Sequence, residues 1–149
     1  MRRGVAFATP LALVAASLAL AACGSVSPSA ALRKWAAGAN LTSNSAQLTL
    51  DARHVLSALH DVHSTGAQLH TVCAVLDLET LQANSALPTP DAQTTSLLSA
   101  AYTDLGDGAN ECYGARGSVA KRNKAAAFLQ RAGAELSEAQ ARVSTLVSS

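Results

Sequence analysis

Apolar residues recur every three or four positions along most of the chain, which is the spacing of one face of an α-helix. Between about residues 44 and 83 the steps alternate between four and three without a slip, through Leu48, Ala52, Val55, Leu59, Val62, Gly66, Leu69, Cys73 and Leu76. The pattern predicts one long helix, bent at most at Gly66, where glycine costs about 1 kcal/mol relative to alanine. Asn44, with Gln47 three residues later, is the predicted N-terminal cap.

The same period returns twice after Pro88-Thr89-Pro90-Asp91. A second helix has its seam at Thr94, Leu98, Ala101, Leu105, Gly108 and Cys112, and a third at Ala125, Leu129, Ala132, Leu136, Ala139, Val143 and Leu146. A short helix over residues 30–37 precedes them, and its Trp35 is expected to pack it on the bundle. No stretch alternates with period two. The predicted fold is therefore all-α, an antiparallel bundle of three long helices plus a short N-terminal helix.

The first residues have the layout of an export signal, because Arg2 and Arg3 precede an apolar stretch that is too short and too rich in alanine for a spanning helix. The stretch leads into Leu20-Ala21-Ala22-Cys23-Gly24, which resembles the lipobox of bacterial lipoproteins. The resemblance implies cleavage before Cys23 and diacylglycerol on its thiol, which anchors the chain to the extracytoplasmic face of a cell membrane. The alternative is ordinary cleavage near residues 19–21, which would release a secreted protein.

This interpretation divides the chain into a removed signal peptide (1–22), the lipidated Cys23 with a flexible tether (23–31) and a helical domain (32–149). The signal takes away two of the 11 basic residues, so 9 face 10 acidic ones. A nearly neutral chain without clustered basic residues argues against nucleic acid as a partner. The closest approach to a basic patch begins the last helix and is expected to be a solvated face: Arg116, Lys121, Arg122 and Lys124.

With Cys23 assigned to lipid, Cys73 and Cys112 remain, and in an exported chain they are expected to form a disulfide. Each lies on the apolar seam of its helix, where a bridge between helices must sit. Cys112 lies farther than Cys73 from a turn near residue 87, by about 16 Å of helix rise. The connection over residues 84–90 is therefore expected to run extended and to carry the second helix past the end of the first.

The spacing of short motifs around the two cysteines is similar to that of small lipoproteins and secreted proteins of actinobacteria. The motifs are Cys73-x-x-Leu76, the link Ala86-Leu87-Pro88-Thr89-Pro90-Asp91, the segment Leu98 to Ala101, and Cys112. The similarity spans roughly residues 32–147, although members often have an aromatic residue where this chain has Leu97-Leu98. It implies a helical, disulfide-linked envelope protein and brings no activity or catalytic residue with it.

All four histidines lie on the first predicted long helix: His54, His60, His63 and His70. His60 and His63, three positions apart on one helical face, are the candidate ligands of Zn²⁺ or Cu²⁺. Two histidines make a weak ligand set, and the alternative, which we favour, is that they flank the apolar seam without a ligand. We therefore expect no cofactor besides the lipid on Cys23.

The sequence offers no catalytic constellation. It contains no Gly-x-Ser-x-Gly and no Cys-x-x-Cys-His, and Gly106-Asp107-Gly108 is expected to loosen the second helix or to permit close packing. We therefore expect a non-enzymatic envelope lipoprotein that serves as an interaction or scaffold module for a protein partner. The alternative function is a small-ligand or metal-binding lipoprotein that uses the histidine-bearing face.

Overall fold

Short polar side chains begin most of the helices in the computed structural model, which describes residues 26–149. Ser27, Thr65, Asp91 and Ser118 each accept a hydrogen bond from a backbone N–H three residues later, which satisfies a donor that a helix start leaves free. The resulting helices are α1 (Pro28–Gly38), α2 (Leu41–His60), α3 (Gly66–Asn84), α4 (Ala92–Tyr113) and α5 (Val119–Ser148). The described residues contain no strand, so the predicted all-α class is confirmed.

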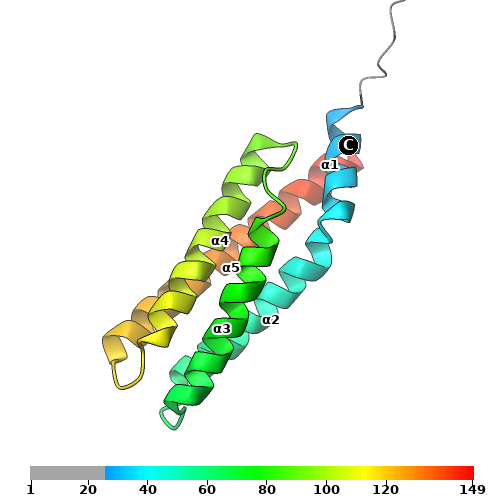
Figure 1. Ribbon diagram of the computed structural model, residues 1–149. Helices are drawn as coiled ribbons and strands as arrows, with labels where there is room; N and C mark the ends of the chain where they lie inside the picture. The colour runs from blue at the N-terminus through cyan, green and yellow to red at the C-terminus, as the bar shows by residue number, and fades with distance from the viewer. Residues whose placement is uncertain (1–25) are drawn as a thin grey trace, which may run out of the picture.

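The four longer helices run alternately down and up as an antiparallel bundle (Figure 1). Each packs on the next in sequence, and α5 closes the bundle by packing on α2 as well as on α4. α3 packs on α2 and α4, and within the described chain its backbone does not come close to that of α1 or α5. α1, the α3–α4 connection and the C-terminus lie at one end of the bundle, and the α2–α3 and α4–α5 connections lie at the other.

The predicted single helix over 44–83 is wrong, because the chain breaks between His60 and Gly66. Asp61 accepts the backbone N–H of His63 at 2.8 Å, a local bond that competes with the helix. Thr65 and Gln68 then form a capping box that starts α3. The bundle therefore has four longer helices and a short first one, not three long helices and a short one.

α2 also starts earlier than predicted. Asn40 adopts a left-handed backbone (φ 48°) directly before Leu41, and the α2 axis turns away from α1 there. The side chain of Asn44 donates to the carbonyl of Ala39, at the end of α1, at 2.8 Å. The expected capping box of Asn44 and Gln47 is therefore wrong, and Asn44 joins the two helices instead.

The predicted apolar seams form most of the core. Every seam residue predicted for α4, and every one for α5 except the half-buried Leu146, is buried. On α2 and α3 the exceptions are Val62, which is 81% exposed, and Gly66, and both lie at the break. The apolar spacing therefore identified the inward positions correctly and the helix ends incorrectly.

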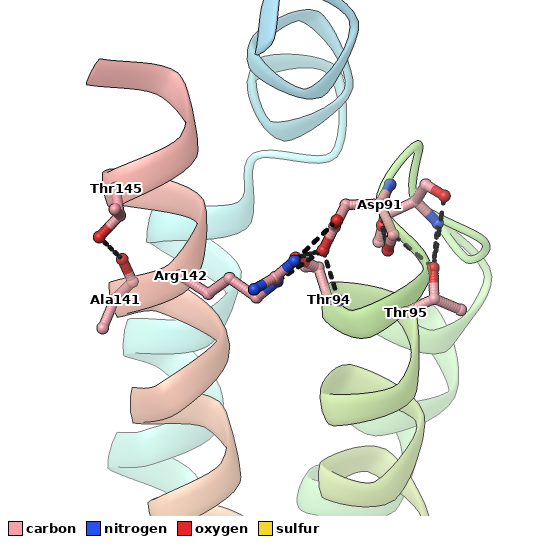
Figure 2. A network of polar contacts seen from close by, with 7 residues as sticks. Asp91, Thr94, Thr95, Ala141, Arg142 and Thr145 are labelled. Atoms are coloured by element: carbon pink, nitrogen blue, oxygen red, sulfur yellow. Dashed lines mark hydrogen bonds and ion pairs between the residues drawn. The ribbon is translucent and has the colours of Figure 1, made fainter. Parts of the chain in front are cut away.

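The α3–α4 connection begins with a turn over residues 84–87 and then runs extended, as predicted from the cysteines, so that α4 begins beyond the end of α3 (Figure 1). Cys73 and Cys112 form the disulfide, with a Cα–Cα distance of 6.0 Å, and both are fully buried. The connection ends at Asp91, which caps α4 and contacts Arg142 on α5 (Figure 2). The bridge and this polar contact hold opposite parts of α4 to the bundle.

Candidate functional site

The predicted lipidation site, Cys23, and the signal peptide of residues 1–22 lie outside the described residues. α1 begins at Pro28, so residues 28–31 of the expected tether form the first turn of a helix. Five positions separate Cys23 from Pro28, which span about 17 Å when extended. Among the helices of residues 26–149, none is long and apolar enough to cross a membrane.

Trp35 packs α1 on the bundle, as predicted. Its indole N–H donates to the carbonyl of Ala86, in the α3–α4 connection, at 2.8 Å, and the ring is half-buried. Arg33 adds a bond of 2.7 Å to the carbonyl of Val147 near the end of α5. These two contacts fix α1 across the end of the bundle from which the preceding chain leaves.

The structure does not place His60 and His63 on one helical face, because His60 ends α2 and His63 lies in the following loop. Both are exposed, as are His54 and His70. Within the part of the chain that the structure describes, no three histidine, cysteine or acidic side chains are placed to hold a metal ion together. The expectation that His60 and His63 share one helical face is therefore wrong, and a metal ion bound by them stays a prediction.

His60 instead lines a hollow of about 370 Å³ at the end of the bundle opposite α1. The hollow lies between the end of α2 and the start of α5, and its lining includes the exposed Val62 and Val119. Arg122 forms part of its wall and donates to the carbonyls of Leu59 and Asp61 at 2.6 and 3.1 Å. The guanidinium thus binds carbonyls that the end of α2 leaves free.

The basic residues at the start of α5 are not simply a solvated face, as the sequence suggested. Arg122 caps α2, and Lys124 forms an exposed ion pair with Glu111 on α4 at 2.6 Å. The aliphatic part of Arg116 lies so close to Gly66 that a Cβ there would meet its Cδ at 3.0 Å. The chemistry of these side chains therefore serves contacts between helices.

The feature that sequence analysis missed is the side of α3 that faces away from the bundle. We call it the α3 outer face, and its residues are Ala67, Thr71, Ala74, Val75, Leu78, Leu81, Gln82 and Ser85. Ala74 is half-buried and the others are exposed, with Leu78 at 67% and Leu81 at 61%. None of the eight carries a charge over five turns of helix. Three large aliphatic side chains therefore share one uncharged, solvent-facing strip.

Charged groups lie only on the two flanks of the α3 outer face. His70 and Asp77 lie on the α4 side. The ring of His70 contacts that of Tyr113 edge to face, with 5.0 Å between the ring centroids. Burial raises the pKa of Tyr113, and the negative charge of Asp77 raises it further. Glu79 lies on the α2 side, with Gln68 about three turns before it. The strip is thus an apolar surface with a polar rim, the arrangement found at protein interfaces.

The sequence contained a signal for this face. Val75, Leu78 and Leu81 fall between the positions of the inward seam, so α3 is apolar on both sides, whereas α5 alternates an apolar seam with charged residues.

No protein-family model, curated protein or solved structure matches the chain.

Proposed function

We propose that the chain is a lipoprotein anchored through Cys23 to the extracytoplasmic face of a membrane, and that its bundle is a non-enzymatic interaction module. The observation that carries the proposal is the α3 outer face. Large aliphatic side chains normally gather on the side of a helix that is buried, whereas this side of α3 faces solvent. Exposed apolar strips with polar rims mark surfaces that bind other proteins.

Two further observations support the extracytoplasmic placement. The lipobox-like residues place a cysteine directly after an export signal, and the two acyl chains of a diacylglycerol provide stable membrane anchoring where one does not. The other two cysteines form a buried disulfide. Disulfides persist in oxidising compartments outside the cytoplasm and are rare within it.

Acylation is tested by mass spectrometry of the native protein and by Cys23→Ser. We expect a mature N-terminus at Cys23 with the mass of diacylglycerol, and we expect the variant to lack lipid label and to leave the membrane or remain uncleaved. The double substitution Cys73→Ser with Cys112→Ser is the control, because it removes the two other cysteines together and leaves the signal unchanged. An unmodified Cys23 thiol with Met1 still attached would overturn the placement.

The interaction surface is tested by photo-crosslinking in intact cells, with a photoreactive amino acid in place of Leu78. The matched control replaces Leu50 on α2, which is 48% exposed and lies off the α3 outer face. We expect defined protein adducts from position 78 and not from position 50. Equal adducts from both positions, or none from position 78, would contradict an interaction through this face.

A second candidate function is binding of a small ligand or metal ion, and the observation that favours it is the hollow lined by His60 and Arg122. The test is calorimetric titration of the mature protein with Zn²⁺ or Cu²⁺. Micromolar binding that is lost in His60→Ala and kept in His54→Ala supports this function. Absence of heat, or binding unaffected by either substitution, eliminates it.

A further inference from the structure

We propose that the surface that covers the α3 outer face is the same face of a second copy of the chain, packed antiparallel about a two-fold axis. The inference rests on the proposed function, since it names the partner of that interaction module. Two-fold dimers are the commonest assemblies of identical chains, and their interface must be complementary to itself. The α3 outer face meets this requirement in side-chain size and in charge.

The size of the side chains changes along the α3 outer face. Its first half carries the small residues Ala67, Thr71 and Ala74, Val75 lies at its middle, and its second half carries the two leucines, Leu78 and Leu81, followed by Gln82 and Ser85. In an antiparallel pair the second half of one helix lies on the first half of the other. Each large leucine then meets small residues, so that the two backbones can approach closely and the side chains interlock. A parallel pair would place leucine against leucine and leave the small residues facing one another.

The polar residues on the two flanks of the α3 outer face favour one alignment of the two helices along their length. In an antiparallel pair the α4-side flank of one α3 lies beside the α4-side flank of the other, and residues at equal heights face one another. The register that places His70 opposite Asp77 of the second copy also places Gln68 opposite Glu79 on the α2-side flank, because both pairs have the same midpoint. In this register Leu78 falls between Ala67 and Thr71 of the second copy.

Both contacts are chemically favourable. An imidazole N–H donates to a carboxylate in either protonation state, and the amide of Gln68 can donate to Glu79. No carboxylate faces another carboxylate, although α3 carries two acidic residues and no lysine or arginine. A helix with this composition has no positive patch for an acidic partner, and in the pair each carboxylate faces a hydrogen-bond donor of the second copy.

The arrangement is compatible with two lipid anchors. The two α1 ends point in opposite directions along the paired bundles, and each lipidated Cys23 lies at most about 17 Å of extended chain from its α1. With the two-fold axis along the membrane normal, both bundles lie along the membrane and the two α1 helices begin at equal heights above the same leaflet. The dimer is thus a flat unit held at two points.

The oligomeric state is tested by sedimentation velocity of the full mature lipoprotein in detergent. We expect a dimer for the natural protein and a shift to monomer for Leu78→Glu and for Leu81→Glu, with the dissociation constant raised at least about 10-fold. Leu50→Glu is the control and should remain dimeric. Circular dichroism and thermal melting check that each variant is folded. Leu78 and Leu81 are both exposed in the single chain, so we expect each variant to fold, and the two variants test the interface independently.

The flank contact is tested by exchanging charges. His70→Asp places two carboxylates opposite one another and should weaken the dimer, and adding Asp77→His in the same chain should restore it. Orientation is tested by a photoreactive residue at position 81, whose adduct should map near Ala67 of the second copy. An adduct that maps to residues 78–85 would show a parallel pair and overturn the antiparallel arrangement.

The outcomes separate this inference from the proposed function. A natural protein that is monomeric in detergent and in cells, but whose position 78 crosslinks to a different protein, removes the second copy and keeps the interaction module. A monomer without adducts at position 78 removes both. A dimer that persists in both leucine variants shows that the copies associate through another surface and also overturns the inference.

Discussion

Asp91 and Arg142, 51 residues apart, form a bidentate ion pair between the first residue before α4 and the last part of α5 (Figure 2). The two bonds measure 2.7 and 2.9 Å, and both side chains are less than one-third exposed. The same carboxylate accepts the backbone N–H of Thr94 at 2.8 Å and its hydroxyl at 2.7 Å. One side chain therefore caps a helix and ties it to its neighbour.

Two substitutions at Asp91 separate these roles. Asn is a good N-cap but has no charge, so Asp91→Asn should cost about 1 kcal/mol of unfolding free energy through the lost charge-assisted bonds. Asp91→Ala removes the cap as well and should cost about 2 kcal/mol. Urea unfolding measures both. Asp104→Asn is the control, because Asp104 pairs with an arginine that is 58% exposed and should contribute less. Equal losses of unfolding free energy in the Asp91→Asn and Asp104→Asn variants would contradict a special contribution of the Asp91–Arg142 pair.

The contribution of Asp91 should depend on pH in a defined direction. The bonds from Arg142, and then those from Thr94, lower the pKa of Asp91 well below its ordinary value of 3.8. A carboxyl whose pKa is lowered on folding stabilises the fold fully above the unfolded pKa and loses this contribution as the pH falls toward the folded pKa. The difference in stability between the natural protein and Asp91→Asn should be constant from pH 7 to about pH 5 and shrink below pH 3.8. A difference that is independent of pH would refute the assignment.

Glu135 on α5 should act in the opposite sense. Burial, and then the charge of Asp104, raise its pKa above 4.5, and its Oε2 is buried without a hydrogen-bond partner in the described chain. A carboxyl whose pKa is raised on folding destabilises the fold once the pH passes its unfolded value. Glu135→Gln should therefore increase the melting temperature at pH 7 and have little effect below pH 4. Glu138→Gln is the exposed comparison, and because the charge of Glu138 also raises the pKa of Glu135, it should give an increase in the same direction that is smaller than that of Glu135→Gln. A lower melting temperature at pH 7 would show that the charge is satisfied.

Two glycines of α4 should respond to alanine in opposite ways. A Cβ at Gly106 would meet nothing within 4 Å, so Gly106→Ala should stabilise the helix by about 0.5–1 kcal/mol. A Cβ at Gly108 would lie 2.7 Å from Cδ2 of Leu129 on α5, in the most extensive helix pair of the bundle. Gly108→Ala should therefore destabilise the fold, because Leu129 must move within a packed core. Thermal unfolding of the two single variants measures both effects. If Gly108→Ala also stabilised the protein, Leu129 would have room to move away from the added Cβ without cost.

The apolar pattern predicted the helical class and nearly all inward positions, because both follow from spacing within one helix. The disulfide was predicted separately, from the two cysteines that remain in an exported chain and lie on the seams of their helices. The apolar pattern did not predict the break between α2 and α3, because Val62 and Gly66 preserve the spacing although neither joins the core. The polar residues there contained the missing information. Thr65 and Gln68 are the capping-box pair, and Asp61 is a residue type that bonds its own backbone.

The candidate site was less predictable, for two physical reasons. The α3 outer face has its own apolar period, offset from the core seam, and which of two apolar sides faces inward depends on the neighbouring helices. The Asp91–Arg142 pair joins residues that only the packing of α4 on α5 brings together. Within the sequence each looks like an ordinary surface charge.

The disulfide provides the last test. Cys73 and Cys112 are 39 residues apart, and closing a loop of this length should contribute about 4 kcal/mol by restricting the unfolded chain. The double substitution Cys73→Ala with Cys112→Ala should therefore lower the unfolding free energy by about that amount. Both residues are changed together, because a single free thiol could bridge two chains.

Urea unfolding with and without reductant supplies the control. Reductant should destabilise the natural protein to a similar extent and leave the double variant unchanged, since only the natural protein has a bond to lose. The bond is fully buried, so its reduction requires opening of the α3–α4 pair and should be slow under native conditions and fast in urea. If reductant leaves the unfolding midpoint of the natural protein unchanged even after full unfolding and refolding, the two thiols are not joined, and the support that they give to an extracytoplasmic location is lost.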